Sequence, residues 1–213
     1  MYIKGEKCKY SFVTLINGQK HRDLLPNIKK FIKELFPHIR PDDVIFCSYI
    51  NNGKVDIEIK CQNECRRIMI KAGKTTCLHT ESISSFVDFL FMIHVPQRVI
   101  MQFVEHYHSS DANIISVSKC LSENFFAKPI INRVLGYDYY QKKIDYLYYG
   151  NVLSGAWIKI DDLKETLLTS GFAYCGDNLK IGKICVYKSK DNKLNFMIGN
   201  LYHHINKKCK SNP

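Results

Sequence analysis

Residues 54–60, Lys-Val-Asp-Ile-Glu-Ile-Lys, alternate polar and branched apolar side chains without a break. In a β-strand, successive side chains point to opposite faces, so one face of this segment is apolar and the other carries Asp56, Glu58 and Lys60. The Asn-Asn-Gly sequence just before it is typical of a hairpin turn, and a further apolar stretch precedes that turn. The segment therefore predicts an inner strand of an antiparallel meander.

Helical and strand patterns alternate around this segment. A stripe of apolar residues at helical spacing runs from Leu24 to Phe36 and stops at Pro37. The other predicted elements are strands at 44–50, 66–71 and 144–150, helices beginning near Glu81 or Ser82, at Pro96 and at Asp161, and a hairpin across 190–193. Since no linker composition separates them, we expect an α/β (α+β) fold in one domain over residues 1–213, with a core at about 20–110 and a C-terminal extension at about 111–213.

The chain is basic along its whole length, with a formal net charge of +11 and a pI of about 9.2. Binding to a polyanion releases counterions wherever a phosphate meets a lysine or arginine, so this charge suits a nucleic-acid partner. A basic surface that binds nothing is the alternative.

The cysteines and the apolar runs predict a cytoplasmic protein. Nine cysteines form an odd set without framework spacing, and the charged N-terminal sequence lacks the apolar region of a signal peptide. We therefore expect reduced thiols. The longest apolar run contains Asp88 and is too short to span a bilayer, so no membrane segment is expected.

The polar face of residues 54–60 has two interpretations. Matching the apolar faces of the two strands gives a predicted register of Ile57 opposite Ile70, Ile59 opposite Ile68, Asp56 opposite Lys71, Glu58 opposite Met69 and Lys60 opposite Arg67. Carboxylates gathered in this way are ligands that Mg²⁺ prefers, and a nearby lysine could activate a water molecule. The alternative is a set of solvent-facing salt bridges, each worth little.

The order of helix, three strands, helix and later strand, with an aspartate on the second strand and a lysine ending the third, resembles the PD-(D/E)XK restriction-endonuclease-like superfamily. More specifically, KVDIEIK and RRIMIKAGKTTCLHTESISSFVDFL are similar to an uncharacterised family of bacterial hypothetical proteins that reads Asp-Ile-x-Ile-Lys, Ile-Ser-Ile-Lys-x-Gly and Ser-Val-His-x-Glu before a Phe-rich helix. The resemblance extends to DLLPNIKKFIKELFPHIRPDDVI and IDYLYYG and covers most of the chain. It implies an αβββαβ core with a C-terminal strand/helix extension.

Two placements of the superfamily motif are open. One matches it literally with Pro41-Asp42 and Glu58-Ile59-Lys60. The other takes Asp56 as the first acid and Lys71 as the lysine, with Met69 where the second acid would stand. Strand count favours the second placement, and either Glu58 or Glu81 would then supply the missing carboxylate.

The resemblance implies a role for each candidate residue. Asp56 and Glu58 would bind metal, Lys71 would position or activate water, and His79 and Glu81 match the family's His-x-Glu. Phosphate contacts are expected from Lys60, Arg66, Arg67 and Lys74. Two features depart from the family: Lys9 aligns with a glutamate that is a common extra metal ligand, and residues 105–111 replace a His-Tyr-x-x-Gly-Asp segment.

The resemblance leaves two functions open. The first is a Mg²⁺-dependent DNA endonuclease of a bacterial or mobile-element conflict system. The second is a catalytically inactive relative that binds nucleic acid or a nucleoprotein as an inhibitor or regulator. DNA is the expected partner, with RNA or a nucleoprotein as alternatives, and a homodimer is among the oligomeric states left open. No zinc is expected, because no second Cys pair stands at finger spacing.

Overall fold

The computed structural model describes residues 5–52, 54–72, 76–109, 114–136, 143–168, 175–199, 201 and 205. Contacts divide them into two compact units. The first contains the described residues up to 72, those from 136 to 162 and residue 205, and the second contains those from 76 to 135 and from 163 to 201. This grouping differs from the expected core and extension, because the chain leaves the first unit after its third long strand and returns to it later.

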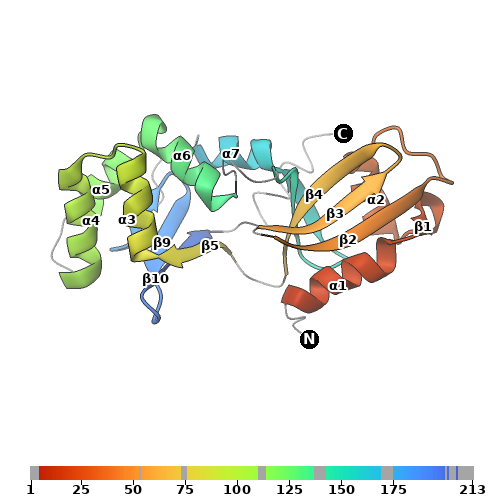
Figure 1. The fold of residues 1–213 in the computed structure, drawn as a ribbon, viewed down its shortest axis with the longest axis horizontal. Helices are drawn as coiled ribbons and strands as arrows, with labels where there is room; N and C mark the ends of the chain where they lie inside the picture. Colours follow the sequence, from red (N-terminus) through yellow and green to blue (C-terminus); the bar gives the residue numbers. More distant parts are fainter. Residues whose placement is uncertain are drawn as a thin grey trace. The chain divides into compact units, whose positions relative to one another are not determined.

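The first unit is built around a mixed six-stranded sheet (Figure 1). Its strands lie in the order β1-β2-β3-β4-β6-β7, and all neighbours are antiparallel except β4 and β6. The elements are α1 (Gly5–Ile16), β1 (Gln19–Lys20), a 3-10 helix (His21–Asp23), α2 (Pro26–Leu35), β2 (Val44–Asn52), β3 (Val55–Cys61), β4 (Glu64–Lys71), β6 (Tyr146–Tyr149) and β7 (Ala156–Lys159).

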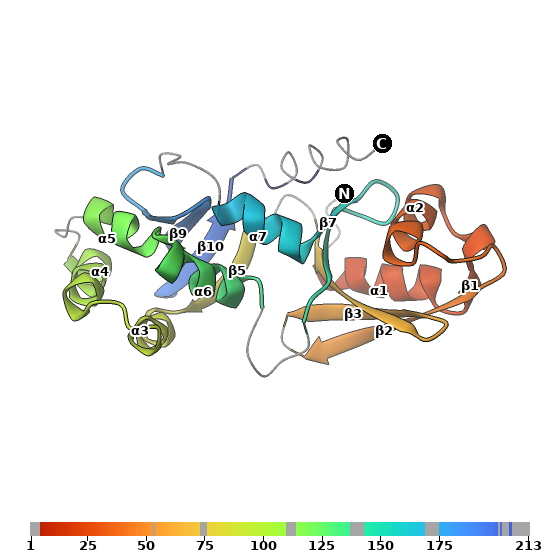
Figure 2. The same cartoon turned by 90° about the horizontal axis from the view of Figure 1, so that it is seen from above.

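Helices α1 and α2 pack on the same face of this sheet, which we call the inner face (Figure 2). Pro26 begins α2 at a position where its missing N–H costs nothing. The predicted stripe then buries Ile28, Phe31, Ile32 and Leu35 against the inner-face residues of β2, β3, β4 and β6. The helix and its stripe are therefore confirmed.

The opposite face of the sheet, which we call the outer face, is exposed on the side of β2 and β3 and buried on the side of β6 and β7. Following the register, the exposed residues Phe46 and Lys60 lie on β2 and β3. Met69, Leu147 and Ile158 continue the same face on β4, β6 and β7 and are buried. Among the described residues, the outer face is thus most open to solvent over β2 and β3, with Arg67 of β4 partly exposed beside them.

The second unit combines helices with an antiparallel four-stranded sheet in the order β5-β10-β9-β8 (Figure 1). Its elements are β5 (Cys77–Ser82), α3 (Ile83–Met92), α4 (Gln97–Ser109), α5 (Ile114–Leu121), α6 (Asn124–Val134), β8 (Leu179–Ile181), β9 (Ile184–Lys188), β10 (Lys193–Ile198) and most of α7 (Ile160–Leu168). Phe86, Phe103 and Phe196 are fully buried in it, and Phe86 contacts the other two rings.

The structure has a mixed α/β architecture, in agreement with the α+β class expected from the sequence. The predicted strands at 44–50, 54–60 and 66–71 are confirmed as β2, β3 and β4, and the hairpin across 190–193 is confirmed as β9 and β10. Strand β5 was not predicted, because its sequence, CLHTES, lacks a clear apolar alternation. Among the helices formed by the described residues, none combines the length and apolar character needed to cross a bilayer.

A disulfide joins Cys175 and Cys185 in the second unit. The expectation that the thiols are all reduced is therefore wrong for this pair. Cys185 lies in β9, and the chain just before β8 carries Cys175 to a Cα–Cα distance of 6.1 Å, within the range that a disulfide spans. Six other described cysteines carry free thiols.

Candidate functional site

Strands β3 and β4 pair two residues away from the predicted register. Ile57 lies opposite Ile68 and Glu58 opposite Arg67, so the predicted pairing of Glu58 with Met69 is wrong. Both registers place the same side chains on the inner face, so apolar matching cannot distinguish them. The length of the hairpin turn decides between the two registers, because Cys61 pairs with Glu64 and only two residues remain for the turn.

Asp56 lies just beyond the last residue pair that joins β3 to β4. The backbone N–H of Ile70 donates a hydrogen bond of 2.6 Å to Oδ2 of Asp56. The other carboxylate oxygen, Oδ1, lies 2.5 Å from Nζ of Lys9, and the Asp56 side chain is only 13% exposed. Both oxygens of this carboxylate therefore have a partner within the protein.

Lys9 reaches Asp56 from helix α1. Burial alone would lower the pKa of Lys9, but the hydrogen bond and charge of Asp56 outweigh it and raise that pKa above its ordinary value. The ammonium is therefore charged at neutral pH, and the contact is an ion pair with a charge-assisted hydrogen bond.

Glu58 is buried and lies between two cations on the outer face. Its Oε1 is 2.9 Å from Nζ of Lys60, and its Oε2 is 3.5 Å from Nε of Arg67. Burial is the largest cause of the raised pKa of the Cys65 thiol, and a hydrogen bond with Glu58 raises this pKa further. Glu58 thus balances positive charge rather than accompanying Asp56 as a free acid.

The predicted magnesium ligands do not fit a metal site as they are arranged. Each oxygen of Asp56 and Glu58 already faces a lysine, an arginine or a backbone amide. Mg²⁺ bound by carboxylates needs oxygens that are available to it, usually with water and phosphate in the remaining positions. Within the described ranges, no three His, Cys, Asp or Glu side chains gather in a way that could hold a metal ion.

Lys71, the predicted water-activating residue, ends β4 on the outer face. It pairs with Tyr149 of β6, and its carbonyl oxygen accepts a 2.9 Å hydrogen bond from the N–H of Gly150. The predicted cross-strand register of Asp56 opposite Lys71 is wrong, because β3 and β4 pair two residues away from it and their pairing ends at Ile57 and Ile68.

The candidate phosphate-binding residues fall into separate places. Lys60 and Arg67 lie on the outer face, whereas Arg66 lies on the other face of β4, paired with Glu64 and with its guanidinium over the Phe36 ring. Alternation along β4 separates the two neighbouring arginines. Lys74 lies outside the described residues.

His79 and Glu81 belong to the second unit, where they form a partly buried polar network with a partner that the sequence did not reveal. Arg133 of α6 donates to both oxygens of Glu81, with Nη2 2.7 Å from Oε2. Nε2 of His79 lies 3.1 Å from Oε1, and the Ser85 hydroxyl donates to Oε2 over 3.1 Å. Burial would raise the pKa of Glu81, but the hydrogen bonds and charges of His79 and Arg133 lower it to about 2.

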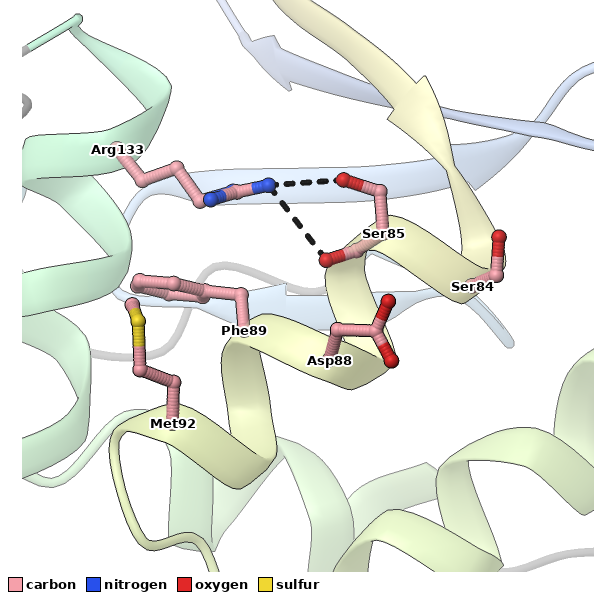
Figure 3. A pocket seen from close by; sticks show the side chains of 6 residues that line it. All are labelled: Ser84, Ser85, Asp88, Phe89, Met92 and Arg133. Carbon is pink, nitrogen blue, oxygen red and sulfur yellow. Dashed lines mark hydrogen bonds between the residues drawn. The ribbon is translucent and has the colours of Figure 1, made fainter.

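An open pocket of about 320 Å³ lies beside this network (Figure 3). Its wall includes Ser84, Ser85, Asp88, Phe89, Met92 and Arg133. Arg133 is held there by the Ser85 hydroxyl at 2.9 Å and by the Phe89 ring, whose centroid is 4.6 Å from the guanidinium carbon. Arg133 therefore links α6 to α3, and its positive charge is paired with the carboxylate of Glu81.

The structure thus brings Lys60, Arg67 and Glu58 together on one face and places Asp56 at the end of the same strand pair. It keeps His79 and Glu81 in a different unit. The sequence-based prediction did not include Lys9 among the functional residues. Its alignment with the family's glutamate was the signal that could have identified it.

Comparison of the sequence with protein-family models and with curated proteins finds no match.

Proposed function

We propose that this chain is a nucleic-acid-binding protein of the PD-(D/E)XK type that binds without cutting, because Lys9 takes the place of a metal ion at Asp56. The observation that carries the proposal is the 2.5 Å contact between Nζ of Lys9 and Oδ1 of Asp56. In this proposal, an ammonium group neutralises the carboxylate that a divalent cation neutralises in an active nuclease. The protein would then act as an inhibitor or regulator.

The position of Lys9 supports this exchange of cation. It aligns with the glutamate that the resembling family carries in its N-terminal helix, and it reaches Asp56 from α1, a helix in the corresponding place. A glutamate at this position would add a metal ligand beside Asp56, whereas a lysine adds a fixed positive charge. A single substitution thus accounts for both the lost ligand and the gained cation.

The topology of the first unit supports the finer fold assignment. Helices precede an antiparallel meander of β2, β3 and β4, and a later strand, β6, pairs in parallel with β4. This order shares the αβββ part and the later parallel strand of the αβββαβ pattern, with the difference that the helices between β4 and β6 belong to residues 76–135 of the second unit. Asp56 lies where β3 and β4 cease to pair, the position proposed for the superfamily's first acid.

The net charge of +11 supports nucleic acid as the partner. The binding would be strongest at low salt, because it depends on the release of counterions from phosphates. The competing function, a Mg²⁺-dependent endonuclease of a bacterial or mobile-element conflict system, would require Lys9 to leave Asp56 before a metal ion could bind.

A binding and cleavage experiment with one preparation of protein tests the proposal. Labelled single-stranded and plasmid DNA would be incubated with the protein at low salt, with and without Mg²⁺ or Mn²⁺. We expect salt-sensitive retardation and no cleavage product. Metal-dependent cleavage that disappears in both Asp56→Ala and Lys71→Ala, but persists in the surface control Asp42→Ala, would overturn it. Absence of binding at low salt would overturn it as well, and would favour a basic structural protein.

A further inference from the structure

We propose that the open part of the outer face binds a single strand of DNA, with Phe46 stacking on a base and Lys60 and Arg67 contacting phosphates. The inference rests on the proposed function and names the surface and the form of the nucleic acid. It starts from an exposed aromatic ring near the beginning of strand β2: Phe46 is 58% exposed, although the neighbouring Ile45 and Cys47 point inward and are buried.

The register places cations directly beside this ring. Phe46 lies opposite Lys60, whose side chain is 56% exposed, and the next outward row contains Ser48, Glu58 and Arg67. Directly opposite residues in a sheet are close enough for their side chains to share one ligand. A base stacked on the Phe46 ring would therefore have its own backbone within reach of neighbouring cations.

The charge balance of these rows favours an anion. Glu58 is the acid of the second row, and both Lys60 and Arg67 face it, so one positive charge remains uncompensated within this group. The charge and hydrogen bond of Glu58 raise the pKa of Lys60, which keeps the ammonium charged at neutral pH. Because Arg67 also faces Glu58, Lys60 can turn to a phosphate without leaving that carboxylate without a cation.

The chemistry of the surface selects a single strand over a duplex. A duplex hides its base faces in its own stack, so an aromatic side chain on an open sheet can stack only on an unpaired base. Val44 lies two residues from Phe46 on the same face and is 36% exposed. It offers an apolar contact to the methyl group of thymine that uracil cannot use, and this favours DNA over RNA.

Fluorescence anisotropy with labelled oligothymidylate of 15 nucleotides tests the inference at low salt. Loss of one base-stacking ring is expected to weaken binding by roughly 5- to 150-fold in Phe46→Ala. The control Phe125→Ala removes a ring that is even more exposed, at 73%, from α6 of the second unit and should bind like the wild type. In Phe46→Trp, stacking should quench the new tryptophan's fluorescence when the oligonucleotide is added.

Two further measurements check the cations and the ligand. Lys60→Ala should reduce the slope of log affinity against log salt by about 0.7, the value for one phosphate contact to a single strand. A 15-base-pair duplex and oligouridylate of the same length should both bind more weakly than oligothymidylate.

The outcomes separate the inference from the proposed function. If the wild type binds oligothymidylate but Phe46→Ala and Lys60→Ala bind equally well, the outer face is not the site, although the protein is still a nucleic-acid-binding protein. Tighter binding of the duplex or of oligouridylate would overturn the assignment to single-stranded DNA. If the wild type binds none of the three, both proposals fail.

Discussion

The ammonium group of Lys9 lies 2.5 Å from Oδ1 of Asp56, and the other oxygen of that carboxylate accepts the backbone N–H of Ile70. One aspartate thus ties helix α1 to strand β4 at the point where β3 and β4 stop pairing. In the motif that predicts a nuclease, both carboxylate oxygens of Asp56 therefore already have a partner within the protein.

Removing Asp56 should cost stability. In Asp56→Ala, the Ile70 amide loses its acceptor and Lys9 loses its counter-ion in a largely buried position, so we expect a loss of about 2 kcal/mol in the free energy of unfolding. Asp42→Ala breaks an ion pair with Arg22 in which the Asp42 side chain is 65% exposed, and it should change stability by less than about 0.5 kcal/mol. Urea unfolding measures both, and equal losses in the two variants would contradict the assigned role of Asp56.

The Glu81 network should make the second unit sensitive to acid. The folded-state pKa of Glu81, about 2, lies below the ordinary value of 4.5. The stabilising contribution of this carboxylate is therefore full above pH 4.5 and is lost as the pH falls toward 2. The two values correspond to about 3 kcal/mol in all, of which about 2 kcal/mol is lost between pH 7 and pH 3.

Urea unfolding at pH 7 and pH 3 tests this with Glu81→Gln as the comparison. The wild type should lose about 2 kcal/mol more than the variant between the two pH values, because the other carboxylates titrate in both proteins. An identical pH dependence in the two proteins would show that Glu81 is not held by Arg133 and His79 as described.

Gly155→Ala should be among the most damaging small substitutions. A methyl group at this position would lie 2.0 to 2.3 Å from ring and hydroxyl atoms of Tyr148, whose side chain is fully buried and whose hydroxyl is fixed by hydrogen bonds to Asn27 and Asn151. Relief of this clash requires the ring or the backbone to move, so we expect a loss of about 3 kcal/mol. The fluorescence of Trp157, the sole tryptophan, reports unfolding nearby, and Gly199→Ala, with nothing within 4 Å, should stay within about 0.5 kcal/mol of the wild type.

The disulfide between Cys175 and Cys185 should stabilise the second unit. It closes a loop with a sequence separation of 10, for which chain entropy predicts a contribution of about 3 kcal/mol. Peptide mapping after alkylation without reductant should find these two cysteines linked, and Cys175→Ser with Cys185→Ser should lower the melting temperature. Full alkylation of both cysteines in the folded protein would contradict the bond, and Cys120→Ser provides a control at a free thiol.

The parts of the fold that depend on local pattern were predictable. The apolar alternation in β3 and the apolar stripe of α2 each indicate which face of the element is buried. Both elements are present as predicted. The pairing of β3 with β4 was not predictable from the apolar pattern, because a shift of two residues preserves both faces. The two-residue turn after Cys61 fixed it.

The contacts that occupy the candidate acids join residues that are distant in sequence. Lys9 and Asp56 lie on different elements, and Arg133 reaches Glu81 across 52 residues of chain. Charge type alone indicates that each acid needs a cation, but the choice of partner depends on how α1 and α6 pack. The sequence therefore indicated which acids matter, and the fold determined that cations in the protein already hold them.

Titration calorimetry with Mn²⁺ tests whether Lys9 holds the place of a metal ion at Asp56. We expect no binding heat for the wild type and measurable heat for Lys9→Glu, because the substituted side chain adds a second carboxylate beside Asp56. Lys7→Glu makes the same change of charge at an exposed position of α1 and should behave like the wild type. Binding of Mn²⁺ by the wild type that Asp56→Asn abolishes would show that Asp56 is a metal ligand and that Lys9 does not replace the metal ion.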